Sequence, residues 1–173
     1  MNKAEKAAAS LLAELAIADV PIDVDEVARR LNLAVTRERL APDLSGLLIR
    51  QPGQPQPVIG VNTAHHPKRQ RFTIAHEIGH FHLGHKGDVI VDGITVNRRD
   101  GVSSTAAVRD ERDANAFAAA LLMPADLLQE RFEQLAAKNY SQSRIVADLA
   151  RTFDVSEQAM NYRLVNLGLL RSH

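Results

Sequence analysis

The stretch Phe72-Thr-Ile-Ala-His-Glu-Ile-Gly-His-Phe81 decides how this 173-residue sequence is interpreted. Pro67 suits the first turn of a helix and Gly84 suits its end, so the stretch is predicted to lie within one helix. Residues four apart lie on the same face of a helix. His76 and His80 can therefore direct two imidazoles at one metal ion.

Glu77 directly follows the first of these histidines. A carboxylate there flanks the metal and can reach a metal-bound water without being a ligand. Zinc lowers the pKa of such a water to about 7, and a nearby carboxylate can take its proton as the water attacks a carbonyl. The apolar neighbours predict a buried helix, where unpaired polar groups cost several kcal/mol. The stretch thus predicts a metal site with Glu77 as general base.

A catalytic zinc normally has three protein ligands and one open position. An extended motif with a third histidine would need glycine at 83 and histidine at 86. The chain has Leu83 and Lys86 at these positions, so that class is disfavoured. A carboxylate from another helix is the remaining option.

A second helix, expected at 106–122, opens with several acidic residues. Glu111 is the preferred third ligand, with Asp113 and Asp110 as alternates. Asn115 shares a helical face with Glu111 and can hydrogen-bond a ligating imidazole. Alanines follow it, and their small side chains would let this helix approach the first one closely.

Breakers and apolar patterns divide the rest of the chain into short elements. Asp23 and Glu26 predict a capping box that opens a short helix. The expected helices cover residues 3–19, 67–83, 106–122, 125–137, 141–153 and 156–167, and the expected strands cover 33–38, 44–50, 57–62 and 89–91, the last followed by a polar loop. Helices, a small sheet and further helices predict an α+β fold. We expect a core at 1–137 and a C-terminal helical segment at 138–173 packed on it.

Composition limits the functional classes. Basic and acidic residues balance at 21 each, which argues against a protein that mainly grips phosphate backbone. Cysteine is absent, so any metal must sit on histidine and carboxylate ligands. Charged residues interrupt the N-terminal apolar stretch, and no run approaches the roughly 18 apolar residues of a membrane span. A cytoplasmic protein with no membrane partner is expected.

Several further segments resemble the ImmA/IrrE family of zinc metallopeptidases, with order and spacing preserved over about residues 20–168. These segments are Ser45-Gly46, Ile59-Gly-Val-Asn62, Arg69-Gln-Arg-Phe-Thr73, Asn115-Ala-Phe-Ala118 and Leu121-Leu-Met-Pro124. The resemblance implies a zincin-like peptidase that binds one zinc per chain through His76, His80 and Glu111. It also implies a protein substrate, a DNA-binding helix-turn-helix repressor or antitoxin-like partner, cleaved in a stress or mobile-element response.

The C-terminal residues 149–168 offer a rival function. They resemble a helix-turn-helix, with Ser156 capping the second helix, so a DNA-binding regulator is the alternative. Residues 156–168 contain one acidic residue, Glu157, and one basic residue, Arg163. A segment without excess positive charge binds the phosphate backbone of DNA weakly. Direct nucleic-acid binding is therefore not expected. A non-catalytic metal-binding scaffold is a further alternative, and Glu77 argues against it.

A tetrahedral intermediate needs a hydrogen-bond donor besides the metal. Tyr140, Arg98 and Arg99 are candidates for this role. His85 is another, since Gly84 can turn it back toward the metal. The sequence does not choose among them.

Residues 57–62 shortly precede the metal-binding helix. By the same resemblance, we expect this strand to lie at a sheet edge and to bind the substrate as an added β-strand.

Overall fold

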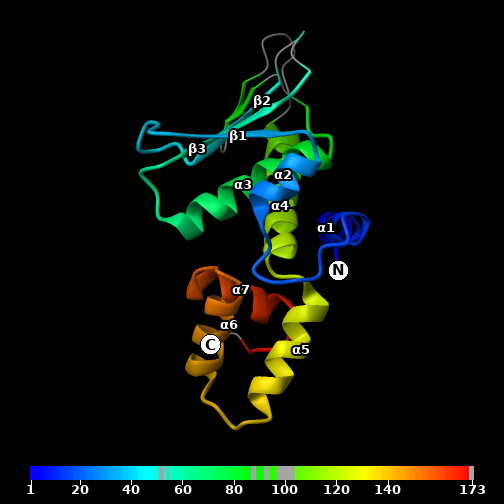
Figure 1. Ribbon diagram of the computed structural model, residues 1–173, viewed down its shortest axis with the longest axis vertical. Helices are drawn as coiled ribbons and strands as arrows, with labels where there is room; N and C mark the ends of the chain where they lie inside the picture. The colour runs from blue at the N-terminus through cyan, green and yellow to red at the C-terminus, as the bar shows by residue number, and fades with distance from the viewer. Residues whose placement is uncertain (51–52, 54, 87–88, 92–93, 97–103, 172–173) are drawn as a thin grey trace.

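The computed structural model describes the whole chain except residues 51–52, 54, 87–88, 92–93, 97–103 and 172–173. A sheet lies at one end and three C-terminal helices lie at the other, with two long helices between them (Figure 1). The α+β prediction is confirmed. Within the described part of the chain, no helix has the length and apolar character that crossing a membrane would require.

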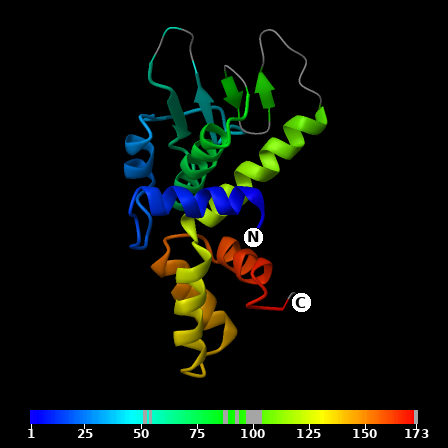
Figure 2. The ribbon, with the colours of Figure 1, turned by 90° about the vertical axis from the view of Figure 1, so that its right-hand side faces the viewer.

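Helix α1, Lys3–Glu14, crosses the long helices near the middle of the molecule (Figure 2). Its capping box pairs Asn2 and Glu5, because each backbone N–H donates to the other side chain at 2.9 Å. The helix was expected to continue to residue 19 but ends five residues earlier. The reason is local, since Ala16 adopts a left-handed conformation with φ of 51°.

Helix α2, Val24–Arg30, begins at Asp23 as predicted. The Asp23 carboxylate accepts a hydrogen bond from the backbone N–H of Glu26 at 3.1 Å. The carboxylate of Glu26 binds Arg29 and Arg30 instead of the backbone of Asp23, so the predicted capping box forms only on the Asp23 side.

Five strands form one sheet in the order β1-β3-β2-β4-β5. Strand β1 pairs with β3 in parallel, and the other neighbours are antiparallel. The strands are β1 Ala34–Glu38, β2 Gly46–Ile49, β3 Val58–Asn62, β4 Val89–Val91 and β5 Ile94–Val96. The first four were predicted, and β5 lies where a polar loop was expected.

The predicted role of β3 as a substrate-binding edge strand is wrong. Ile59 pairs with Val35 of β1 on one side and with Leu48 of β2 on the other. Ile59 and Val61 are fully buried, as befits an interior strand. The N–H and C=O groups on both sides of β3 therefore face strands of the same sheet.

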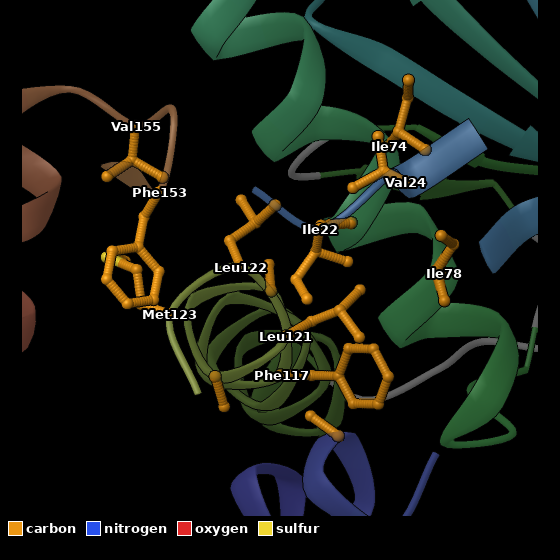
Figure 3. Packing of buried hydrophobic residues seen from close by; sticks show 14 of the residues in the cluster. Ile22, Val24, Ile74, Ile78, Phe117, Leu121, Leu122, Met123, Phe153 and Val155 are labelled. Atoms are coloured by element: carbon orange, nitrogen blue, oxygen red, sulfur yellow. The ribbon is translucent and has the colours of Figure 1, made fainter. Parts of the chain in front are cut away.

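Helices α3, Pro67–His82, and α4, Ser104–Leu122, pack closely against each other. A Cβ added at Gly79 would lie 3.1 Å from Phe117 Cδ1 and 3.2 Å from the carbonyl oxygen of Ala114. Ile78 and Phe117 fill the interface nearby, both without solvent exposure (Figure 3). The absence of a side chain at Gly79 sets how near the two helices come.

The C-terminal helices are α5 Ala125–Ala136, α6 Gln142–Thr152 and α7 Glu157–Asn166, as predicted. Apolar residues Phe153 and Val155 lie beside Met123 at the end of α4 (Figure 3). The Lys68 ammonium donates to the carbonyl oxygen of Val155 at 2.8 Å, which ties α3 to the start of α7.

A buried arginine makes a second connection between the C-terminal helices and the rest of the chain. Arg163 of α7 is 3% exposed and pairs with the carboxylate of Glu5 in α1. Its Nε also donates to the carbonyl oxygen of Met123 at 3.2 Å. The one base of 156–168 is therefore used inside the protein.

Candidate metal centre

His76 and His80 lie one turn apart in the buried part of α3. They are 4% and 1% exposed, and their Nε2 atoms lie 3.0 Å apart. Two ligands on a tetrahedral zinc, each bound at about 2.0–2.1 Å, lie about 3.3 Å apart. The imidazole pair is thus close to the spacing that one ion requires.

Glu111 reaches the same point from α4. Its Oε2 lies 3.4 Å from His76 Nε2, and its Oε1 lies 3.2 Å from His80 Nε2. Ligand atoms of these three residues all lie within 4.8 Å of one another. We call His76, His80 and Glu111 the metal-binding group, and their nitrogen and carboxylate donors fit one metal ion.

The two alternate acids are placed elsewhere. The Asp110 carboxylate lies 3.7 Å from His85 Nε2, and that of Asp113 lies 3.9 Å from Arg112 Nε. Neither belongs to the metal-binding group found among the described residues. The structure thus brings Glu111, rather than its neighbours, to the two histidines.

Opposing effects act on the Glu111 carboxyl group. Burial raises its pKa, but hydrogen bonds and charge interactions with His76 and His80 prevail and lower it to about 2. The carboxylate is therefore ionised at neutral pH, which is the form that a metal binds.

Asn115 contacts the far nitrogen of His76, as the helical spacing predicted. Its Oδ1 lies 3.1 Å from His76 Nδ1. An amide oxygen can only accept, so this geometry assigns the imidazole proton to Nδ1. The Nε2 lone pair of His76 is left to face the metal position.

His85 contacts the far nitrogen of the other histidine. Gly84 has φ of 71° and turns the chain back at the end of α3, as the sequence allowed. His85 Nδ1 then lies 2.9 Å from His80 Nδ1. Burial lowers the pKa of His85, and the nearby charge of Asp110 opposes this effect.

Arg50, which directly follows β2, was not singled out from the sequence. Its guanidinium donates to the carbonyl oxygens of His80, at 3.2 Å, and of His85. Burial lowers the pKa of Arg50, while the charge of Glu77 opposes the change. No local pattern marks this arginine, because its partners are backbone atoms some 30 to 35 residues away.

Glu77 directly follows His76 in α3 and has no solvent exposure. Its position next to His76 on α3 is the one that the motif requires of a general base. The structure therefore keeps Glu77 buried on the helix that carries both histidines, directly after His76.

Tyr140, another oxyanion candidate, is not brought to this group. Tyr140 lies in the α5–α6 connection, where the Arg144 guanidinium covers its ring at 4.0 Å. Both views place that connection at the end of the molecule away from the sheet (Figures 1 and 2). Arg98 and Arg99 lie outside the described residues.

A cleft of about 250 Å³ opens beside the metal-binding group. A groove of about 340 Å³ shares Arg69 and Phe72 with this cleft and extends between the start of α3 and α7. The cleft is lined by Ser45, Arg69, Phe72, Thr73, His76 and Asn115. The groove is lined by His66, Lys68, Arg69, Phe72, Leu122, Val155, Ser156 and Ala159.

Two histidines and a glutamate around one point, with a second glutamate next to the first histidine in sequence, could hold one metal ion, and this arrangement is typical of metallopeptidases. The chain belongs to the peptidase family described as the IrrE N-terminal-like domain, whose family model matches residues 28–165. The resemblance to the ImmA/IrrE family is thereby confirmed.

Curated relatives include the radiation response metalloprotease IrrE of two Deinococcus species. The Deinococcus radiodurans protein is 36% identical over 110 residues, which cover 62% of this chain and 30% of the relative. The Deinococcus deserti protein is 37% identical over 107 residues, covering 62% and 35%. This chain thus spans about a third of the length of these relatives.

A solved structure described as a Mycobacterium tuberculosis transcriptional regulator has a similar fold. It matches with a TM-score of 0.63 and 20% identity, over 95% of this chain and 46% of the other. At this identity the likeness concerns the fold alone. It extends to nearly the whole chain, including most of the C-terminal helices.

Proposed function

We propose that this chain is a zinc-dependent endopeptidase with a zincin-like core at 1–137 and a helix-turn-helix-like segment at 138–173. His76, His80 and Glu111 bind one zinc, and Glu77 is the general base. The observation that carries the proposal is the convergence of three donor atoms within 4.8 Å, with buried Glu77 next to the first ligand. The proposed setting is the cytoplasm.

When bound, zinc polarises the substrate carbonyl and makes a bound water acidic near neutral pH. Asn115 holds His76 with its Nε2 lone pair toward the metal position. Glu77 takes a proton from the attacking water, whose oxygen bonds to the carbonyl carbon. Glu77 then gives the proton to the amide nitrogen as the carbon–nitrogen bond breaks.

The cleft and the groove together offer a path for an extended peptide past His76. Phe72, Leu122 and Val155 give the groove apolar walls, whereas Lys68 and Arg69 are basic. None of the residues that line either hollow is acidic. We infer that the preferred peptide has an apolar residue next to an acidic one.

The substrate is proposed to be a DNA-binding helix-turn-helix repressor or an antitoxin-like partner. Support comes from the family resemblance, in which such repressors are cleaved during stress or mobile-element responses. The curated relatives are named for a radiation response, which agrees with a stress setting.

Two variants test the proposed chemistry. Glu77→Gln keeps the shape of the side chain but cannot take a proton, so it should retain about one zinc per chain and lose hydrolysis by about 10²–10⁴-fold. His80→Ala removes a ligand and should lose both zinc and hydrolysis. Zinc is measured by elemental analysis, and cleavage is measured on purified repressors encoded near this gene.

The two variants separate the possible failures. Hydrolysis by Glu77→Gln at the wild-type rate would remove the general-base role. Equal zinc content in His80→Ala and wild type would remove the assigned metal site. A zinc-loaded wild type that cleaves neither the repressors nor unfolded proteins would leave the non-catalytic scaffold as the better interpretation.

A further inference from the structure

The position of His80 fixes where its proton must lie. Its Nε2 is 3.0 Å from His76 Nε2 and 3.2 Å from the Glu111 carboxylate, so this nitrogen belongs to the metal-binding group. A metal-binding imidazole is neutral and offers a lone pair to the metal. The proton of His80 must therefore be on Nδ1.

The proton of His80 determines that of His85 in turn. The two Nδ1 atoms lie 2.9 Å apart, a hydrogen-bond distance that leaves room for one proton. Because His80 supplies it, His85 Nδ1 must accept and His85 carries its own proton on Nε2. That nitrogen lies 3.7 Å from the Asp110 carboxylate, on the side of the ring away from His80.

We propose that His85 is a positioning residue that holds His80 in its metal-binding tautomer, as Asn115 does for His76. The metal-binding part of the proposed function is assumed here, whereas the peptidase activity is not. Partners of ligating histidines fix both the proton and the ring orientation, and losing one commonly lowers metal affinity about 10–100-fold.

Backbone hydrogen bonds and a glycine turn hold His85 in the position from which it contacts His80. Gly84 supplies a left-handed turn, with open space where a Cβ would be. The N–H of His85 donates to the carbonyl oxygen of His80 at 3.1 Å, and Arg50 donates to the carbonyl oxygen of His85. The imidazole of His85 is thereby placed in contact with His80, although His85 is not a member of the metal-binding group.

The competing explanation is that His85 only fills space beside His80, whose ring it meets edge-on with centroids 4.9 Å apart. Asparagine and leucine separate the two explanations, because they have nearly the same shape. The Oδ1 of asparagine can stand where Nδ1 of histidine stands and accept a hydrogen bond, whereas leucine offers no acceptor.

The experiment measures zinc affinity by competition with a chromogenic chelator. His85→Leu should weaken zinc binding about 10–100-fold, and His85→Asn should stay within about 3-fold of wild type. His85→Gln, whose amide reaches past the Nδ1 position, should resemble leucine. Thermal unfolding of the metal-free proteins controls for stability. If His85→Leu does not fold, the comparison of zinc affinity between His85→Asn and His85→Gln distinguishes the two explanations.

Nitrogen-15 NMR of the histidines provides a second measurement on the zinc-loaded wild type. The inference expects the proton on Nδ1 of His80 and on Nε2 of His85, a result that space filling alone would not produce. A proton on Nδ1 of His85 would overturn the inference, as would wild-type affinity in His85→Leu or equal losses in the asparagine and leucine variants.

Failure of this inference differs from failure of the proposed function. If zinc binds with the expected ranking but no protein is cleaved, the peptidase proposal fails and the role of His85 stands. If the wild type binds no zinc, both are overturned.

Discussion

Replacing Gly79 with alanine tests whether α3–α4 packing sets the geometry of the metal-binding group. The added Cβ would lie 3.1 Å from Phe117 Cδ1 and 3.2 Å from both Phe117 Cβ and the Ala114 carbonyl oxygen. Carbon atoms normally meet at about 3.5–4.0 Å. The neighbouring atoms must therefore give way by a few tenths of an ångström. Two of the three contacts are with α4 atoms that a rotamer change cannot move, so the helices themselves must separate.

The expected stability change is small, because two effects oppose. Overpacking a core costs about 1–3 kcal/mol. Alanine regains about 0.5–1 kcal/mol over glycine inside a helix. The net loss of about 0–2.5 kcal/mol should lower the Tm of the metal-free protein by at most about 10 °C, at about 2–4 °C per kcal/mol for a chain of this size.

The expected effect on metal binding is larger. Glu111 lies one helical turn before Ala114, so a shift of α4 is carried to its carboxylate, while His80 directly follows Gly79 on α3. Metal–ligand distances tolerate only about 0.2 Å. We expect Gly79→Ala to weaken zinc binding at least 10-fold, measured by chelator competition.

Gly168→Ala is the matched control. Gly168 has φ of 72° with open space around the added Cβ, so this change costs about 1–2 kcal/mol through the backbone alone. It lies after α7, away from the metal-binding group, and should lower Tm without changing zinc affinity. If Gly79→Ala lowers Tm but keeps zinc affinity within about 2-fold of wild type, the coupling between helix spacing and metal binding is refuted.

Three further outcomes are expected. Removing zinc should lower Tm by about 5–11 °C when free zinc is 100 times its Kd, because the ligation then stabilises the fold by about 2.7 kcal/mol, and calorimetry with a chelator checks this. Arg69→Glu should shift cleavage from peptides with an acidic residue toward those with a basic one, and an unchanged preference in a peptide library would exclude the inferred path along the cleft. DNA binding should be weak, since Arg163 is buried against Glu5, and sequence-specific affinity tighter than about 10⁻⁸ M at physiological salt would contradict this.

Local chemistry explains why the sequence predicted helix α3 well. The bounds of α3 follow from Pro67 at its start and Gly84 after its end, and both act within one turn. The shared face of His76 and His80 follows from helical periodicity. Glu111 could not be assigned from local patterns alone, because its distance to the histidines depends on how the helices α3 and α4 pack.

Properties of the sheet were harder to predict, because strand order is not a local property. Residues 57–62 form the expected strand, yet β2 and β1 occupy both of its sides. Nearness in sequence to the metal-binding helix does not place a strand at an edge. Arg50 was missed for the same reason, because its contacts are not local in sequence. Its hydrogen-bond partners are backbone oxygens in the last turn of α3 and just after it.

The two histidines proposed as ligands are held in different ways. Asn115 holds His76 from α4, the helix that also carries Glu111, so any shift of α4 moves a ligand and a ligand partner together. His85 holds His80 from the chain that leaves α3, a segment that Arg50 ties to the end of β2. We therefore expect packing between α3 and α4 to set the distance between the proposed ligands, and the turn at Gly84 to set the orientation of the His80 ring. Changes at these two places both act on His80, so their effects on the free energy of zinc binding should be coupled and should not simply add.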